Sequence, residues 1–157
     1  MDVTVINPFI TGLSDVLTNM TDIEFKINKI HLKTADDLPR TVTGFIDLSA
    51  ETTKGSLAIC FDRDVILEVY EKILGEAVIE INEDVEDCVG EITNMVCGTA
   101  KALLAAKGHQ FELTTPSVIL GDTTAIPHFQ PKPIIVIPFS TEKGDIHIEV
   151  TIKTDAA

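Results

Sequence analysis

A glutamate and an asparagine three residues apart are the side chains in this sequence best suited to chemistry. Glu91 and Asn94 fall in a stretch that predicts a helix. At ~100° per residue they lie on one face of that helix, in a stripe with Asp87 and Gly98. A carboxamide can donate to a water and accept from it without adding charge, and a carboxylate one turn away can pair with a cation. Such a pair can hold a water beside a charged partner.

The same stripe also fits an ordinary solvated helix face. The residues on the opposite side are apolar and are predicted to pack on a sheet: Val89, Ile92, Val96, Ala100 and Leu103. Gly98 in mid-helix costs about 1 kcal/mol relative to alanine, and such a glycine often admits a close neighbour. On the pattern alone the solvated face is favoured, because solvated faces are far commoner than sites.

Apolar spacing and cap residues predict three helices, over Pro8–Asn19, from Asp62 as N-cap to Gly75, and over about Asp84–Lys107, the last opened by Asn82 or Asp84. Alternating and β-rich runs predict strands at Ile23–Leu32, Thr41–Leu48, Gly55–Phe61, His109–Leu113, Ser117–Leu120, Pro133–Phe139 and Asp145–Lys153. Lys143-Gly144 is the expected hairpin turn. The segment Gly121–Pro133 is predicted to be a long loop.

A short internal echo indicates two similar halves. Asp15–Met20 aligns with Gly90–Met95, and each stretch lies on a predicted helix that precedes strands. Chance is a rival explanation, because the match is short. The sequence therefore predicts an α/β fold of the α+β type, a single domain over residues 1–157, with two helix-plus-strands halves and long helices packed on a mostly antiparallel sheet.

Several runs resemble one protein family. Gly90–Gly98 is similar to the phosphatase signature of the CheC, CheX and FliY proteins of bacterial chemotaxis, a Glu and an Asn three apart on an exposed helix. The runs Ile6–Phe9, Lys54–Leu57 and Pro116–Gly121 resemble the CheX family in particular, and together these runs cover most of the chain.

The number of motifs also resembles CheX. CheC-type members carry the motif in both halves, whereas CheX carries only the second. Here Asn19 matches Asn94, but Val16 stands where a glutamate is needed and belongs to the apolar stripe of its helix. The first site is therefore expected to be inactive, and Asn19 is expected to cap the helix end.

The resemblance implies a phosphatase that hydrolyses the aspartyl phosphate of a CheY-like response regulator. Asn94 would orient the attacking water and Glu91 would dock against a lysine of the receiver. Asp87 and Gly98 would contact the partner, with the glycine keeping the surface low. No metal or cofactor of its own is implied, since Mg²⁺ comes with the receiver, and a homodimer is implied.

A non-catalytic chemotaxis or flagellar-switch module that binds a receiver is the alternative from another class. The pairing of Glu91 with Asn94 argues against it, because binding alone does not require the asparagine. The double aspartate Asp62 and Asp64 resembles that of haloacid-dehalogenase phosphatases, but Ile66 stands where Thr or Val is needed. A helix cap is the favoured role for Asp62.

Composition restricts the partners and the compartment. The net charge of -13 disfavours nucleic acid and an anionic membrane, which both need a basic footprint. No apolar run is long enough to span a bilayer, and no secretory signal is seen. Three cysteines without such a signal indicate reduced thiols in the cytoplasm. The four histidines lie in separate segments, which gives metal catalysis little support, and His147 is expected to face solvent.

Overall fold

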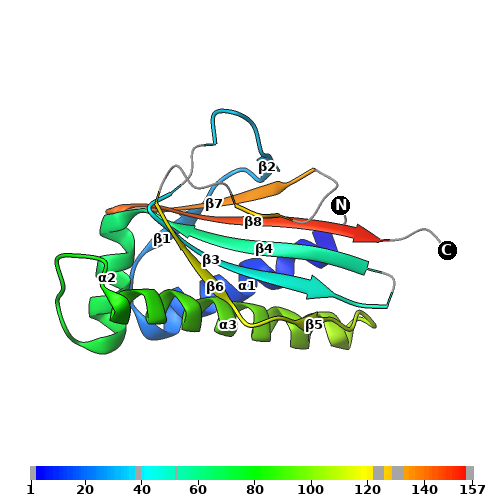
Figure 1. Ribbon diagram of the computed structural model, residues 1–157, viewed down its shortest axis with the longest axis horizontal. Helices are drawn as coiled ribbons and strands as arrows, with labels where there is room; N and C mark the ends of the chain where they lie inside the picture. Colours follow the sequence, from blue (N-terminus) through cyan, green and yellow to red (C-terminus); the bar gives the residue numbers. More distant parts are fainter. Residues whose placement is uncertain (1–2, 38–39, 52, 122–125, 129–132, 155–157) are drawn as a thin grey trace.

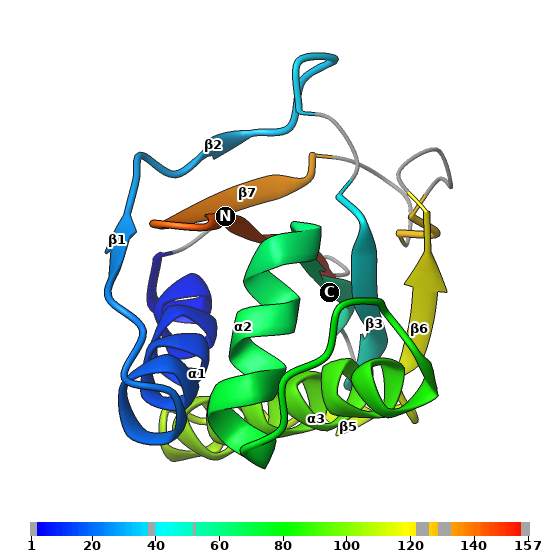
Figure 2. The same ribbon diagram turned by 90° about the vertical axis from the view of Figure 1, so that its left-hand side faces the viewer.

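Over the residues that the structure describes, the fold consists of three helices packed on one face of an eight-stranded sheet (Figures 1 and 2). It is seen in a computed structural model, which describes residues 3–37, 40–51, 53–121, 126–128 and 133–154. The strand order is β1-β7-β8-β4-β3-β5, with β2 also pairing with β7 and β6 with β3. All of these pairs are antiparallel, as the sequence predicted.

The helices are α1 (Val3–Met20), α2 (Arg63–Leu74) and α3 (Glu83–Ala106). In Figure 2, α1 and α3 run side by side beneath the sheet, and α2 crosses near one end of α3. Gly75 closes α2 in the left-handed conformation, at φ 75°, as expected of a C-terminal glycine. None of the helices in the described part of the chain is long and apolar enough to cross a membrane.

Pro8 does not begin the first helix, so the prediction of a start at Asn7-Pro8 was wrong. The helix begins at Val3 and Pro8 lies inside it, where it cannot donate to the carbonyl of Thr4. Lys107 Nζ, from the end of α3, lies 3.4 Å from that carbonyl oxygen and donates to it. A tertiary contact therefore offsets part of the cost of proline at this position.

The strands are β1 (Phe25–Ile27), β2 (His31–Leu32), β3 (Val42–Ser49), β4 (Thr53–Phe61), β5 (Glu112–Leu113), β6 (Ser117–Leu120), β7 (Ile135–Thr141) and β8 (Gly144–Thr154). The predicted strand Ile23–Leu32 is thus two short strands, and His109–Leu113 contributes only its last two residues. The β7–β8 turn is Glu142-Lys143, because Thr141 pairs with Gly144. The predicted turn was one residue late.

The element order confirms the two similar halves. Each half is a long helix followed by four strands, α1-β1-β2-β3-β4 and α3-β5-β6-β7-β8, with α2 between them. The short strands β1 and β2 of the first half pair with β7 of the second, while β5 and β6 of the second pair with β3 of the first. The long strands β4 and β8 pair at the centre of the sheet. Each half therefore adds its short strands to the edge formed by the other half.

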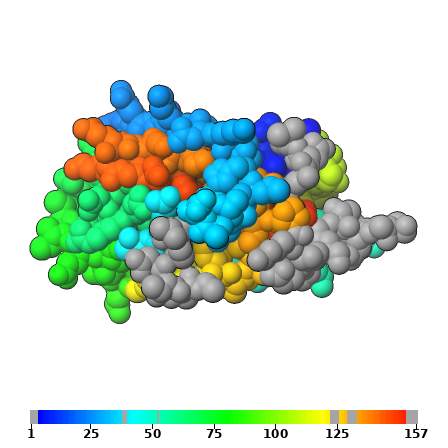
Figure 3. All heavy atoms as spheres, turned by 90° about the horizontal axis from the view of Figure 1, so that it is seen from above, coloured from blue at the N-terminus to red at the C-terminus, as the bar shows by residue number. Residues whose placement is uncertain are grey.

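The second face of the sheet carries a buried polar layer, which the sequence did not predict. His147 is 7% exposed and Glu149 is 4% exposed, because Lys33 and Arg40 from the segment after β2, together with His128, contact them. Figure 3 shows the segment around β2 over this face of the sheet. Glu149 accepts from Lys33 Nζ at 3.0 Å and its Oε1 lies 2.9 Å from His128 Nε2. The expectation that His147 faces solvent was therefore wrong.

Candidate functional site

The predicted stripe lies on the outer face of α3. Asp87, Glu91, Asn94 and Gly98 are all exposed. On the opposite side, Val89, Ile92, Val96 and Ala100 are each at most 1% exposed and form part of the core. Leu103 was predicted to join them but is 38% exposed, and Leu104 is buried in its place. The periodicity therefore placed the stripe correctly and failed only near the end of the helix.

Local signals position the start of α3. The Asn82 side chain accepts a hydrogen bond from the Val85 backbone N–H at 3.0 Å, so Asn82 rather than Asp84 is the N-cap. Glu83, Asp84 and Glu86 lie in the first turn, where the helix dipole favours negative charge.

Two glycines hold the middle of α3 close to its neighbours. Gly44 of β3 lies against Thr93, whose hydroxyl donates to the Val89 carbonyl at 2.8 Å, and a methyl group on Gly44 would overlap the Thr93 Oγ1 atom. A methyl group on Gly12 of α1 would lie 2.7 Å from the Val96 carbonyl oxygen. Thr93 and Val96 flank Asn94, so the turn that bears the asparagine is held by both the sheet and α1.

The surface beside Asn94 is open. A methyl group on Gly98 would meet no atom of the described residues within 4 Å. The glycine therefore leaves the helix surface low at the residue one turn after Asn94, and nothing in the described part of the fold requires a glycine there.

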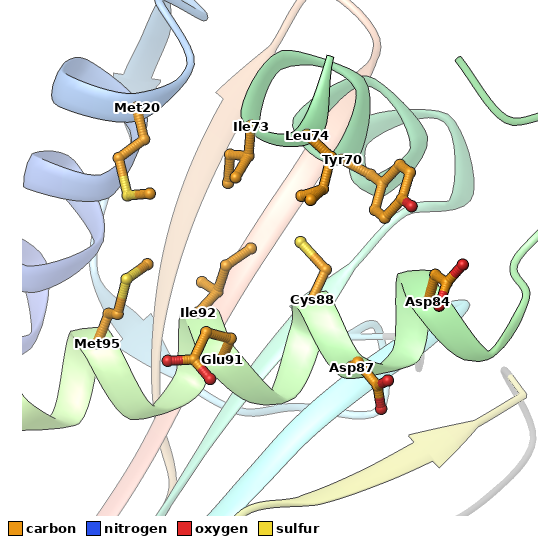
Figure 4. A pocket seen from close by; sticks show the side chains of 10 residues that line it. All are labelled: Met20, Tyr70, Ile73, Leu74, Asp84, Asp87, Cys88, Glu91, Ile92 and Met95. Carbon is orange, nitrogen blue, oxygen red and sulfur yellow. The ribbon is translucent and has the colours of Figure 1, made fainter. Parts of the chain in front are cut away.

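An apolar pocket of about 520 Å³ adjoins the stripe where α1, α2 and α3 meet (Figure 4). Met20, Ile73 and Leu74 line one side of it, and Ile92, Cys88 and Met95 of α3 line the other. The pocket lining also includes Tyr70, Asp84, Asp87 and Glu91. Glu91 and Asp87 thus belong both to the stripe and to the pocket.

The cysteines are not placed to act as nucleophiles. Burial raises the pKa of Cys97 and of Cys60 to about 12, and burial together with the charge of Glu91 raises that of Cys88 to about 11. All three are free and buried thiols. They stay protonated at neutral pH, and the reactive form of cysteine is the thiolate.

Asp62 has a structural role that differs from the predicted one. It occupies the N-cap position of α2, but its side chain makes no cap hydrogen bond. Its carboxylate instead accepts from Arg40 Nη1 at 3.0 Å and from the Asp145 backbone N–H at 2.8 Å. These contacts tie α2 to the sheet and engage both carboxylate oxygens, which argues against a nucleophilic aspartate.

The matching turn of α1 differs from α3 as the sequence indicated. Val16 is 6% exposed and packs in the core, while Asn19 is exposed in the last turn. The helix end is held by Thr21, whose hydroxyl donates to the Leu17 carbonyl at 2.6 Å and accepts from the Ile23 N–H at 3.1 Å. The predicted cap role therefore falls to Thr21 rather than Asn19.

Sequence reasoning missed the pocket beside the stripe. Apolar spacing along the sequence predicts that Ile73 and Leu74 lie on the buried side of α2 and Met20 on that of α1. Leu74 is 55% and Met20 40% exposed, because each lies in the last turn of its helix, where the helix leaves the core. Periodicity identifies the apolar face of a helix but does not show which residues of that face extend beyond the elements that pack on it.

The chain matches known proteins along most of its length. Residues 42–140 match the family model described as chemotaxis phosphatase CheX. The CheY-P phosphatase CheX of Thermotoga maritima is 25% identical over 154 residues, covering 96% of this chain and 97% of that protein.

Solved structures agree with this match. A CheC-like superfamily protein from Shewanella sp. PV-4 is 42% identical with a TM-score of 0.92, covering 98% of this chain and 99% of that one. A chain of the CheX-CheY-BeF3-Mg²⁺ complex from Borrelia burgdorferi is 26% identical with a TM-score of 0.80, covering 94% and 97%. With these matches and an exposed Glu91–Asn94 stripe on α3, the chain belongs to the CheX family of chemotaxis phosphatases.

Proposed function

We propose that this protein hydrolyses the aspartyl phosphate of a CheY-like response regulator, with Glu91 and Asn94 on α3 as its working pair. The observation that carries the proposal is the exposure of both side chains on one helical stripe, above a turn held close to the sheet and to α1. The CheX relative in T. maritima that is named a CheY-P phosphatase supports the same activity.

Asn94 acts by positioning a water. An aspartyl phosphate is an acyl phosphate and is already reactive, so what a receiver lacks is a water fixed in line with the phosphorus. The Asn94 carboxamide can accept from that water and donate to it or to a phosphoryl oxygen without adding negative charge. The water oxygen bonds to phosphorus, the bond from phosphorus to the aspartyl oxygen breaks, and the products are the aspartate carboxylate and inorganic phosphate. Alignment of this kind lowers the barrier without proton abstraction by the amide.

Glu91 acts as the docking group. It lies one turn before Asn94 on the same stripe, so a partner that places its phosphate at Asn94 must also meet this carboxylate. A carboxylate near a phosphate is repelled unless a cation lies between them. A lysine of the receiver's active site is the group that makes this arrangement favourable.

The metal in the reaction belongs to the receiver. When bound there, Mg²⁺ offsets the negative charge on the phosphoryl oxygens, and the complex of a CheX chain with CheY, BeF3 and Mg²⁺ from B. burgdorferi contains the same ion. Within the described residues of this chain, no group of three or more His, Cys, Asp or Glu side chains is placed to hold a metal.

The protein acts as a homodimer in this proposal, as its resemblance to CheX implies. Each chain has its own stripe, so hydrolysis does not require both. Light scattering checks this separately: about twice the chain mass of 17.1 kDa is expected at micromolar concentration, and a mass equal to one chain contradicts the dimer.

The direct test is the decay of a phosphorylated CheY-like receiver with and without the protein, with Mg²⁺ present in both arms. A faster decay that increases with protein concentration is expected. Binding of the phosphorylated receiver without faster decay would instead identify a non-catalytic interaction module. Candidate receivers are taken from the same organism. The substrate is the receiver whose dephosphorylation the protein accelerates.

A further inference from the structure

The catalytic stripe alone is too narrow to hold a receiver domain. Four residues on one helical line make it up, and two of them are an asparagine and a glycine. A specific protein complex buries about 800 Å² on each partner. The receiver must therefore contact a wider surface around α3, and most of the binding free energy of such a contact comes from apolar anchors in pockets.

The apolar pocket at the junction of α1, α2 and α3 directly continues the stripe. Glu91 and Asp87 line the pocket and also belong to the stripe, so a partner over Glu91 borders the pocket opening (Figure 4). Its walls carry two methionines, Met20 and Met95, and the exposed leucine Leu74. Methionine side chains adapt to an incoming apolar group. The stripe and the pocket thus form one continuous surface.

The charge at the pocket has one sign. Its lining includes the carboxylates of Asp84, Asp87 and Glu91, and among the described residues it contains no lysine or arginine. An apolar floor with an acidic rim fits an apolar side chain flanked by lysine or arginine. It fits poorly the surface of a second copy of this chain, whose net charge is -13.

We propose that the pocket lined by Met20, Leu74 and Met95 is the docking site for the receiver itself, and that it takes an apolar side chain of the receiver flanked by basic residues. The proposal rests on the proposed function, because it assigns the pocket to the same partner. In this proposal, the pocket and its acidic rim determine the affinity and the specificity for the receiver, while Asn94 determines the rate of hydrolysis.

The test changes the polarity of the pocket without changing its charge. The variant Leu74→Asn with Met20→Gln is compared with Ile79→Asn, whose side chain is 82% exposed and lies outside the pocket lining. The probe is a CheY-like receiver carrying BeF3⁻ and Mg²⁺, with affinity measured by titration calorimetry. Loss of an apolar anchor is expected to weaken binding roughly 5- to 30-fold, and the control is expected to bind as wild type does.

A second pair of variants tests the rim. Asp84→Asn removes a rim charge, and Glu80→Gln removes an exposed charge outside the pocket lining. The association rate of the receiver is expected to fall, and to depend less on salt, only for Asp84→Asn, because rim charges steer a basic partner. Equal effects of the two changes would contradict a basic occupant.

Docking at the pocket and hydrolysis of the phosphate are tested by separate outcomes. If wild-type protein accelerates receiver dephosphorylation but Leu74→Asn with Met20→Gln binds receiver as tightly as Ile79→Asn, the pocket is not the docking site and the phosphatase stands. If that pocket variant turns a wild-type dimer into a monomer in sedimentation, a second copy occupies the pocket, and the assignment to the receiver is overturned. If wild type binds the receiver without hydrolysing its phosphate, the calorimetry still decides the pocket.

Discussion

Gly44 of β3 lies directly against Thr93 of α3, with no room for a methyl group between them. Thr93 is fully buried and precedes Asn94, so the fit between strand and helix sets the height of the asparagine above the sheet. Gly12 makes the equivalent close approach to Val96 from α1. The position of Asn94 is thus fixed from beneath, although its side chain is exposed.

Gly44→Ala is expected to displace this turn of α3. Overpacking of this kind costs about 1–3 kcal/mol in the free energy of unfolding. The maximal dephosphorylation rate is expected to fall as well, because Asn94 moves with the turn. Urea denaturation and single-turnover decay measure the two effects. Adding Thr93→Ala removes the overlapping hydroxyl and is expected to restore much of both. Simply additive losses in the double variant would contradict the fit described.

Gly98→Ala separates stability from docking. Alanine in mid-helix is favoured over glycine by about 1 kcal/mol, and the added methyl group meets open space, so the free energy of unfolding is expected to rise. The same methyl group stands on the stripe one turn after Asn94, where the receiver is proposed to pack. A raised half-saturating concentration in a more stable protein is therefore expected. Unchanged dephosphorylation kinetics would show that the low surface at Gly98 has no part in docking.

Only the second half is expected to be active. Val16 is buried where a glutamate would be needed, so Asn19 has no glutamate three residues before it on α1. Asn19→Ala is expected to leave the dephosphorylation rate nearly unchanged, since Thr21 rather than Asn19 holds the helix end. A loss of rate as large as that of the same change at Asn94 would mean that both halves work.

The free energy of unfolding should depend on two histidines with opposite signs. Burial, and then the charge of Arg40, lowers the pKa of His147 below its usual value of 6.5. As the pH falls below 6.5, His147 therefore becomes protonated in the unfolded chain before it does so in the folded chain. This group therefore destabilises the fold as the pH falls. The hydrogen bond to Asp37 raises the pKa of His31, so its contribution is fully present below the unfolded pKa and is lost as the pH rises through the folded pKa.

Urea denaturation at pH 7 and pH 5 tests these signs. His147→Gln keeps an acceptor for Arg40 and is expected to reduce the fall in the free energy of unfolding toward pH 5. His31→Gln is the matched control and is expected to make that fall steeper. Changes of the same sign in both variants would be incompatible with the two shifts.

The helix stripe and the halves could be predicted because they depend on local periodicity. Asp87, Glu91, Asn94 and Gly98 share a face whatever α3 packs on, and the echo between α1 and α3 marks the repeat. The catalytic role of the motif was inferred from its resemblance to a family, since a Glu and an Asn three residues apart on a solvated face do not by their spacing alone indicate a reaction.

The parts that escaped prediction depend on contacts between distant segments. His147 alternates with isoleucines as a solvent-facing residue does, but the segments around β2 and His128 cover that face of the sheet. Pro8 is typical of a helix start, and the lysine at the far end of α3 that donates to the Thr4 carbonyl is distant from it in the sequence. The pocket arises from the ends of two helices, which no periodicity within one helix can reveal.

Glu91→Ala and Asn94→Ala should fail in different ways. Glu91→Ala removes the charged contact proposed with the receiver, and losing one partner of a desolvated ion pair can cost about 2–5 kcal/mol of binding free energy. Binding to a receiver that carries BeF3⁻ and Mg²⁺ is therefore expected to weaken for Glu91→Ala and to be largely kept for Asn94→Ala. Both side chains are exposed, so neither change is expected to unfold the protein. Equal loss of affinity in the two variants would contradict separate roles.

The central claim is that Asn94 orients the attacking water, and single-turnover decay of phosphorylated receiver at saturating protein tests it most directly. Saturation removes any difference in docking, so the observed rate is that of hydrolysis in the complex. Asn94→Ala is expected to slow this rate by ~10²–10³, the scale seen when one preorganised hydrogen-bonding group is lost. Hydrolysis by Asn94→Ala at the wild-type rate under saturation would show that the proposed mechanism is wrong.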